Sequence, residues 1–180
     1  AQRYAGVNMA NGNPMYYKKD GTIVQCNPTN GKYYVYNPDK PNEMSEVMNL
    51  QNDDKVILGT TIPKWFGGFD NTFTYKNWDL NLFFRFSGGN KIVNYQRLNM
   101  LSMGFYNNSK EILGRWQSPE NPGDGKMPKL YYNKTSQVNY TTSSRWVERG
   151  DFLKLQNVQL GYSLPSSVCK KLKMQKLRMY

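Results

Sequence analysis

Apolar and polar residues alternate most clearly between residues 63 and 90. Aromatic side chains recur at odd positions in the first half of this segment, at Trp65, Phe69, Phe73 and Tyr75. After Lys76-Asn77 the apolar set moves to even positions, at Trp78, Leu80, Leu82, Phe84 and Phe86. Successive side chains of a strand point to opposite faces, so a period of two predicts β-structure. Two such runs around a two-residue turn predict a long hairpin, with arms over 63–75 and 78–90.

A second alternating segment covers residues 151–164 and contains one slip of phase. Leu153 and Leu155 share one phase, whereas Val158, Leu160, Tyr162 and Leu164 share the other. A β-bulge near Gln156-Asn157 would return all of them to one face of a strand. Pro165 is expected to end that strand. We expect one short helical turn within 166–175 and the start of another strand at 176–180.

Two long segments show no sustained period. Residues 1–62 are rich in Asn, Gly, Pro and Tyr, and turn sequences such as Asn30-Gly31 predict only short strands, at 15–17 and 32–36. Residues 91–147 predict a loop of unusual length for a compact domain. Long connections on one side and short turns on the other are typical of outer-membrane barrels.

The alternation alone is compatible with two architectures. A sandwich hairpin with one buried face shows the same pattern. A tilted membrane-spanning strand of about ten residues also shows it, and adds aromatic girdles at both ends of its apolar band. Trp65 at one end of the hairpin, and Tyr75 and Trp78 at the other, fit those girdles.

Composition narrows the possible chemistry. The 180 residues include 14 Tyr, 8 Phe and 4 Trp, which argues against a disordered chain, and no apolar run approaches the length of a membrane-spanning helix. Histidine is absent, so the usual metal ligand and general base are missing. Cys26 and Cys169 lie far apart in the sequence; two free thiols are the simpler expectation, although a disulfide is allowed.

No catalytic, cofactor-binding or metal-binding residue is predicted, and we do not expect an enzyme. The 13 carboxylates are scattered, and nothing in the sequence brings two of them together as a glycosidase would require. Asp70 and Asp79 fall on polar faces of the predicted hairpin, where a solvated surface explains them.

The net charge of +11 raises the question of nucleic acid. The aromatic residues alternate along strands and do not interleave with basic ones, so nucleic acid is not expected as a partner. No acidic residue follows Asp151, and a solvated turn or contact with anionic lipid headgroups explains the basic run. That run comprises Lys154, Lys170, Lys171, Lys173, Lys176 and Arg178.

Aromatic and amide residues in the loops could stack on sugars or bind peptides, or could pack the loops on themselves. These residues are Tyr106, Asn107, Asn108, Trp116, Tyr131, Tyr132 and Tyr140. The sequence does not choose between these roles, so substrate-binding residues are left unassigned.

Several motifs occur in a characteristic order over most of residues 55–180. They include Val56-Ile57-Leu58-Gly59, Gly67-Gly68-Phe69-Asp70-Asn71, the segment 145–155, the segment 157–165, and Leu177-Arg178-Met179-Tyr180. As a set they resemble the C-terminal barrel region of SusC/RagA-type TonB-linked transporters. Residues 1–54 resemble the variable loop that precedes this region.

The resemblance implies an all-β fold, in which antiparallel strands form part of a 22-stranded transmembrane β-barrel with long extracellular loops. Residues 1–62 would be an extracellular loop region and 63–90 a transmembrane hairpin. Residues 91–147 would be an extracellular loop, and 148–180 a transmembrane strand, a periplasmic turn and the start of the next strand. The plug and the TonB-contacting segment are missing, so we expect a piece of a larger protein. Residues 50–55 lack the glycine and acidic spacing of a calcium-like loop found in many relatives, and no calcium is predicted.

The implied function is active import of large nutrients, oligosaccharides or peptides, across a bacterial outer membrane. The implied partners are a SusD-like lipoprotein, the TonB complex and outer-membrane lipid; no cofactor is implied. Two alternatives stay open. One is the same barrel used as a structural scaffold in an outer-membrane complex. The other is a soluble β-rich surface-binding module, whose strands 65–75 and 78–86 would be buried against a second sheet.

Overall fold

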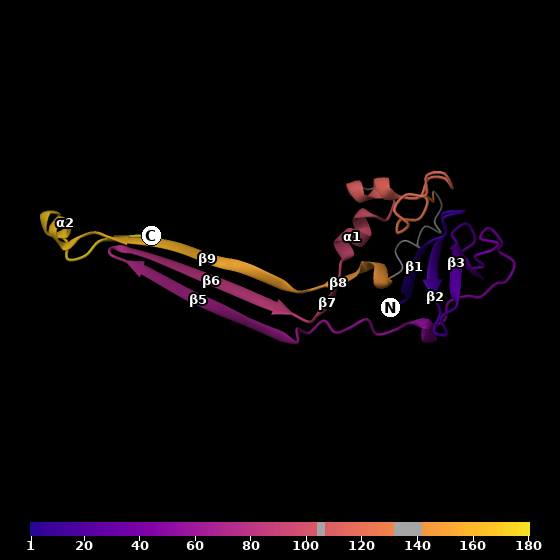
Figure 1. Cartoon of the computed structure of the whole chain (residues 1–180), viewed down its shortest axis with the longest axis horizontal. Coiled ribbons are helices and arrows are strands. Elements are labelled where there is room, and N and C mark those ends of the chain that lie inside the picture. The colour runs from indigo at the N-terminus through magenta and orange to yellow at the C-terminus, as the bar shows by residue number, and fades with distance from the viewer. Residues whose placement is uncertain (104–106, 132–141) are drawn as a thin grey trace. The chain divides into compact units, whose positions relative to one another are not determined.

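The computed structural model describes residues 1–103, 107–131 and 142–180 (Figure 1). Contacts divide the chain into two compact units. The first comprises Ala1–Gly59 and Ile92–Glu148, and the second comprises Thr60–Lys91 and Arg149–Tyr180. Among the described residues, no helix is both long enough and apolar enough to cross a membrane.

The first unit contains a four-stranded antiparallel sheet in sequential order. Its strands are β1 (Arg3–Val7), β2 (Pro14–Tyr17), β3 (Ile23–Asn27) and β4 (Lys32–Val35). The short strands expected at 15–17 and 32–36 are therefore confirmed, but they belong to a larger sheet. β3 has no alternating pattern in the sequence, because Val24, Gln25 and Cys26 are all buried and a strand buried on both faces shows no alternation.

Two apolar clusters form the core of this unit. One, beside the sheet, comprises Tyr16, Val24 and Cys26. The other comprises Leu98, Leu101, Met103, Met127 and Trp146. Most of this second cluster comes from the segment that showed no period in the sequence. Short helices supply its local structure: α1 (Tyr95–Met100), and the 3₁₀ turns η2 (Lys110–Gly114) and η4 (Ser144–Trp146).

Two short strands, β7 (Lys91–Val93) and β8 (Val147–Arg149), pair where the chain passes between the units. A further 3₁₀ turn, η1 (Asn52–Asp54), lies in the first unit.

The second unit is built on one long antiparallel sheet with the order β10-β9-β6-β5. β5 (Trp65–Tyr75) and β6 (Trp78–Gly88) form the predicted hairpin, in register from Trp65 opposite Gly88 to Tyr75 opposite Trp78. Lys76 adopts a positive φ of 53° in the two-residue turn, as hairpin turns of this length require.

β9 (Phe152–Ser163) pairs with β6, and β10 (Arg178–Met179) pairs with β9. The register shifts between Phe83 and Phe84, leaving Gln156 unpaired, which confirms the predicted bulge. The expected helical turn is α2 (Ser166–Lys171).

Candidate functional site: the two faces of the long sheet

One face of the long sheet is apolar across three strands. Residues opposite one another form cross-strand rows, such as Phe69–Phe84–Leu155 and Phe73–Leu80–Leu160. Because Gln156 has no partner residue at the bulge, the apolar side chains of β9 before and after it lie on the same face. The rows between and beside them are Gly67–Phe86–Leu153, Asn71–Leu82–Val158 and Tyr75–Trp78–Tyr162. One glycine makes room within this face: a Cβ at Gly67 would lie 2.7 Å from the ring of Phe86.

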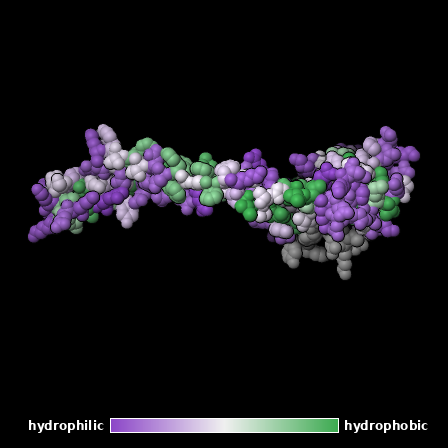
Figure 2. Space-filling model, turned by 90° about the horizontal axis from the view of Figure 1, so that it is seen from below, coloured by the Kyte–Doolittle hydropathy of each residue, from purple (hydrophilic) through white to green (hydrophobic). Residues whose placement is uncertain are grey.

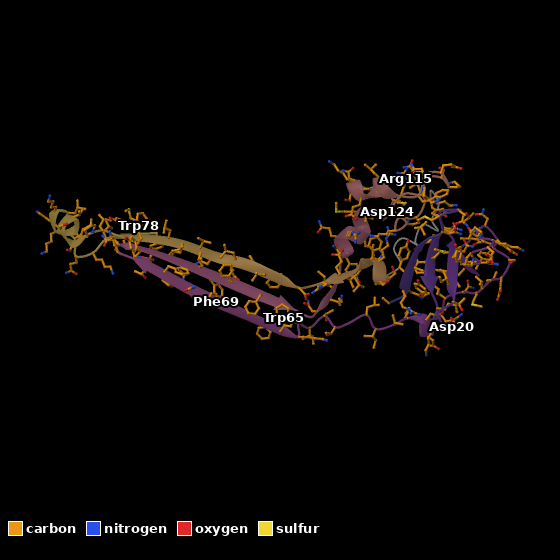
Figure 3. The ribbon with its side chains drawn as sticks, in the orientation of Figure 1. Asp20, Trp65, Phe69, Trp78, Arg115 and Asp124 are labelled. Atoms are coloured by element: carbon orange, nitrogen blue, oxygen red, sulfur yellow. The ribbon has the colours of Figure 1, made fainter. Side chains whose placement is uncertain are left out.

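Aromatic rings mark both ends of the apolar face. Trp65 and Trp78 lie at opposite ends of the sheet, with Phe69 between them (Figure 3). The rings of Trp78 and Tyr162 are 4.6 Å apart between centroids, and those of Trp65 and Phe86 are 6.1 Å apart. The 11 residues of β5 extend over about 35 Å at about 3.3 Å per residue. A strand of that length tilted by about 45° rises about 25 Å, which matches the height of the apolar band on transmembrane barrels.

The apolar face is uncovered in the second unit. Phe69 is 55% exposed, Val158 is 57% exposed and Leu153 is 73% exposed. Hydrophobic residues gather along the sheet, and hydrophilic residues dominate at the α2 end (Figure 2). A monomeric soluble protein rarely exposes a continuous apolar surface of this kind. A sandwich would bury these faces against a second sheet, and the described residues of this unit form one layer only.

The opposite face of the same strands is mainly polar. Asn81 donates from Nδ2 to Asp70 Oδ1 and, at 3.0 Å, to Thr72 Oγ1. Asn157 continues this chain of amides by donating to Asn81 Oδ1 at 3.4 Å. Asp70 and Asp79 therefore lie on the polar face, as the sequence predicted. The described residues contain no group of three or more His, Cys, Asp or Glu side chains that could hold a metal ion.

An ion pair closes the polar face at the α2 end. Arg178 Nη2 donates to Asp79 Oδ2, from β10 to β6, across the intervening strand β9. The residue beneath this pair is Gly161, where a Cβ would lie 2.6 Å from Asp79 Oδ2 and 2.9 Å from Arg178 Nε. Only a residue without a side chain leaves this space, so Gly161 permits the contact between the outer strands.

The described loop aromatics pack within the first unit. Trp116 donates from Nε1 to the carbonyl of Met9 at 2.8 Å, and Gly12 lies beneath its ring. Tyr131 donates from its hydroxyl to Asn13 Oδ1. Lys129 Nζ lies 5.9 Å from the Trp116 ring centroid and 5.2 Å from that of Tyr131. These two aromatic residues therefore have internal partners.

The two loop amides, Asn107 and Asn108, differ in their surroundings. Asn108 accepts a hydrogen bond from the backbone N–H of Met103 at 3.3 Å, whereas Asn107 is exposed. Tyr106, Tyr132 and Tyr140 lie outside the described residues.

Residues 50–55, which lack the features of a calcium-binding loop, are organised around Asp54. Its carboxylate accepts hydrogen bonds from Lys18 Nζ at 3.0 Å and from the backbone N–H groups of Lys19 at 2.9 Å and Gln51 at 2.7 Å. Desolvation of the buried carboxylate raises its pKa, but these donors outweigh it and lower the pKa of Asp54 to about 2. Lys18 and Lys19 lie in the β2–β3 turn, and Gln51 immediately precedes η1.

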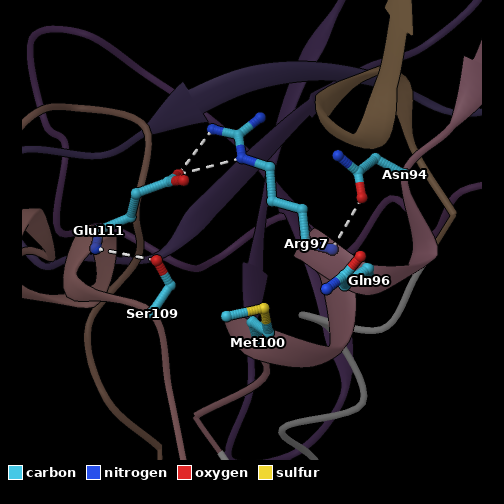
Figure 4. Close-up of a pocket in the computed structure, with 6 residues that line it drawn as sticks. All are labelled: Asn94, Gln96, Arg97, Met100, Ser109 and Glu111. Atoms are coloured by element: carbon cyan, nitrogen blue, oxygen red, sulfur yellow. Dashed lines mark hydrogen bonds and ion pairs between the residues drawn. The ribbon is translucent and has the colours of Figure 1, made fainter. Parts of the chain in front are cut away.

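A shallow pocket of about 230 Å³ opens beside α1 in the first unit (Figure 4). Its lining consists of Asn94, Gln96, Arg97, Met100, Ser109 and Glu111. Arg97 bridges two carboxylates, Glu111 at 2.9 Å and Glu148 at 3.2 Å. Its charge is thus already neutralised, and the pocket is not a ready anion site. Sequence reasoning missed this cluster, because its members lie 14 and 51 residues from Arg97.

The cysteines are free and buried. Cys26 lies in the core of the first unit, where burial raises the pKa of its thiol to about 12. Cys169 lies in α2, with its Sγ 3.6 Å from the carbonyl oxygen of Leu164. The expectation of two free thiols is confirmed.

Curated relatives of this chain share a common name. "TonB-dependent receptor P3" of Formosa agariphila is 33% identical over 131 residues, which are 73% of this chain and 12% of that receptor. "TonB-dependent receptor P26" of the same organism is 32% identical over 117 residues, 64% of this chain and 11% of the receptor. The chain thus spans about an eighth of the length of the relatives it matches. No family model matches the sequence.

A structural likeness covers nearly the whole chain. The structure of the RagAB peptide importer in its "open-open" state matches with a TM-score of 0.67 at 20% identity, over 98% of this chain and 17% of that one. The structure of the RagAB peptide transporter matches with a TM-score of 0.62 over the same shares. At this identity the match concerns the fold, which is all-β with few helices and predominantly antiparallel.

Fold and faces together define an all-β protein whose long sheet has one apolar surface and one polar surface. The chain belongs to the SusC/RagA-like TonB-dependent transporters, of which it represents one portion. The matched proteins are named as receptors and as an importer, so their names point to transport and not to catalysis.

Proposed function

We propose that this chain forms part of the wall of an outer-membrane, TonB-dependent importer of large nutrients, either oligosaccharides or peptides. The two-faced sheet carries the proposal. Its apolar face has the height of a bilayer's hydrocarbon band and aromatic rings at both ends, while its opposite face is polar and suits a solvated lumen. The relatives named TonB-dependent receptors support the same assignment.

In this proposal β5, β6, β9 and β10 are neighbouring strands of a closed 22-stranded barrel. Closure removes the unpaired edges that the sheet would otherwise expose at β5 and β10. The two-residue turn and the segment 165–175 would face the periplasm. Residues 1–62 and 91–147 would lie on the extracellular side, where a SusD-like lipoprotein would dock. The chain would break no bond; substrate would pass along the polar face once the plug is displaced through TonB.

The test uses the full-length parent protein in its native host. Cells would be given labelled peptides and labelled oligosaccharides, with TonB present or deleted, and uptake would be measured. We expect uptake of one of these classes, and its loss when TonB is deleted or the proton gradient is collapsed. After detergent extraction, intact-mass measurement should detect a lipoprotein that co-purifies with the parent protein in an equimolar amount.

A second candidate is a scaffold in an outer-membrane complex, which the same two-faced sheet would serve. It predicts an intact membrane complex without TonB-dependent uptake of either class. Absence of the parent from the membrane fraction would contradict both candidates.

A further inference from the structure

The segment that joins β9 to β10 concentrates positive charge. Lys170, Lys171, Lys173 and Lys176 follow one another over seven positions and are all exposed. From Phe152 to Tyr180 the chain contains no acidic residue. Asp79, a carboxylate at the same end of the sheet, is already paired with Arg178. None of the ion pairs found in the described part of the chain involves these four lysines.

The lysines are held on a defined turn. α2 ends in a Schellman-type cap, in which Met174 N–H donates to the carbonyl of Cys169 at 2.9 Å and Lys173 N–H donates to that of Lys170 at 3.1 Å. Lys173 has the positive φ of 55° that this cap requires. The buried Cys169 side chain anchors the turn beneath its exposed lysines.

Apolar side chains are exposed among these lysines. Leu172 is 51% exposed, Met174 48% and Val168 40%. The aromatic row Tyr75–Trp78–Tyr162 lies at the same end of the sheet, since Tyr162 precedes Pro165 by three residues. Across a membrane interface, apolar groups are expected first, then aromatic rings, then lysines. The aliphatic part of each lysine stays in the apolar layer, while its ammonium group reaches the headgroups.

We propose that the segment 165–176 is a docking surface for anionic phospholipid headgroups of the bilayer leaflet at the α2 end of the sheet. This inference rests on the proposed transmembrane role and adds a lipid preference to it. Charge complementarity selects the occupant: four unpaired ammonium groups beside an aromatic girdle match phosphate-bearing headgroups with net negative charge. Exposed Leu172 and Met174 would be buried at the boundary of the acyl chains. A purely polar partner would leave these apolar side chains without an apolar environment.

The test uses the full-length protein purified in detergent. Native mass spectrometry would count bound dioleoyl phosphatidylglycerol and dioleoyl phosphatidylcholine, which differ in headgroup charge and share their acyl chains. One lysine near an anionic surface favours binding by about five-fold. We expect the native protein to retain phosphatidylglycerol over phosphatidylcholine by at least about ten-fold, and the preference to fall as salt rises.

Three variants make the test specific. Lys170→Gln, Lys171→Gln, Lys173→Gln and Lys176→Gln together should abolish the preference, and the four matching Lys→Arg changes should keep it. The control replaces four exposed lysines of the first unit, at positions 19, 32, 110 and 126, by Gln; it should leave the preference intact. Heat-modifiable mobility on electrophoresis would verify in each case that the barrel is folded.

The outcomes separate this inference from the proposed function. If the folded native protein retains both lipids equally, or if the folded four-Gln variant keeps the preference for phosphatidylglycerol, the lipid surface is overturned and the proposed transporter stands. If the four-Gln variant instead loses an acidic protein subunit with lipid retention unchanged, the surface belongs to that protein and the inference also fails. A native protein that retains neither lipid and is absent from the membrane fraction overturns both proposals.

Discussion

At the scale of single residues, Asp54 carries the clearest energetic prediction. Three donors surround its carboxylate, and hydrogen bonds to a charged group contribute about 2 kcal/mol. Asp54→Asn should therefore destabilise the Lys18–Asp54 region by about 2 kcal/mol, seen as faster hydrogen exchange at residues 18–20 and 49–55 of the full-length protein. The neighbouring Asp53 is exposed, so Asp53→Asn is the matched control and should change little.

The same carboxylate predicts a pH dependence. The pKa of Asp54 in the fold, about 2, lies below that of an unfolded aspartate. Its stabilisation is therefore complete above about pH 4 and is lost as the pH falls from about 4 toward 2. Hydrogen exchange measured between these values should show local opening in the native protein and a weaker pH response in Asp54→Asn. Equal responses in the two proteins would remove Asp54 from this role.

Residue-scale features were also the hardest to predict from the sequence. Asp54 meets Lys18 and Lys19, which lie 36 and 35 residues away, and Arg97 meets Glu148 at a separation of 51. Such pairs leave no local pattern, because only the fold brings them together. Trp116 and Tyr131 illustrate the same limit. The sequence around an aromatic residue in an irregular segment does not show whether that residue binds a ligand or packs on a neighbouring turn.

At the scale of elements, the long sheet was largely predictable. Period-two patterns depend only on the alternation of side chains along a strand, so the hairpin, its turn and the Gln156 bulge could be derived before the fold was known. The four-stranded sheet of the first unit could not, because β3 buries Gln25 between two apolar neighbours. Gln25 is accommodated by hydrogen bonds to the carbonyl oxygens of Pro41 and Glu43.

The two faces of β9 predict opposite responses to the same substitution. Val158 lies on the apolar face near the middle of the sheet, and its neighbour Asn157 lies on the polar face. Val158→Lys should destabilise the folded barrel by about 2–4 kcal/mol, the cost of a lysine at the bilayer midplane. Asn157→Lys should cost far less. Unfolding of the full-length protein in lipid vesicles by denaturant measures both. Equal costs would contradict the assignment of the apolar face to lipid.

The bulge predicts an asymmetry between two single-residue deletions. Removing Gln156 restores a regular strand and keeps Leu155 and Val158 on the same face, so the barrel should still fold. Removing Asn81 from β6 moves every later side chain of that strand to the opposite face, so Leu82 would point toward the polar side. The folded fraction of each variant in membranes, judged by heat-modifiable mobility, should be near normal for the first deletion and close to zero for the second.

At the scale of the whole molecule, the unpaired edge of β5 carries the last prediction. Among the described residues β5 pairs with β6 on one side only, so alternate backbone N–H groups along its 11 residues have no strand partner there. Within a closed barrel those groups would meet another strand, because unpaired backbone is not tolerated in the hydrocarbon region. Hydrogen exchange on the full-length protein in lipid should therefore show slow exchange at every amide of β5, without alternation. β6, which has partners on both sides, is the internal reference. Fast exchange at alternate β5 amides beside a protected β6 would identify β5 as a true sheet edge and exclude a closed wall at this position.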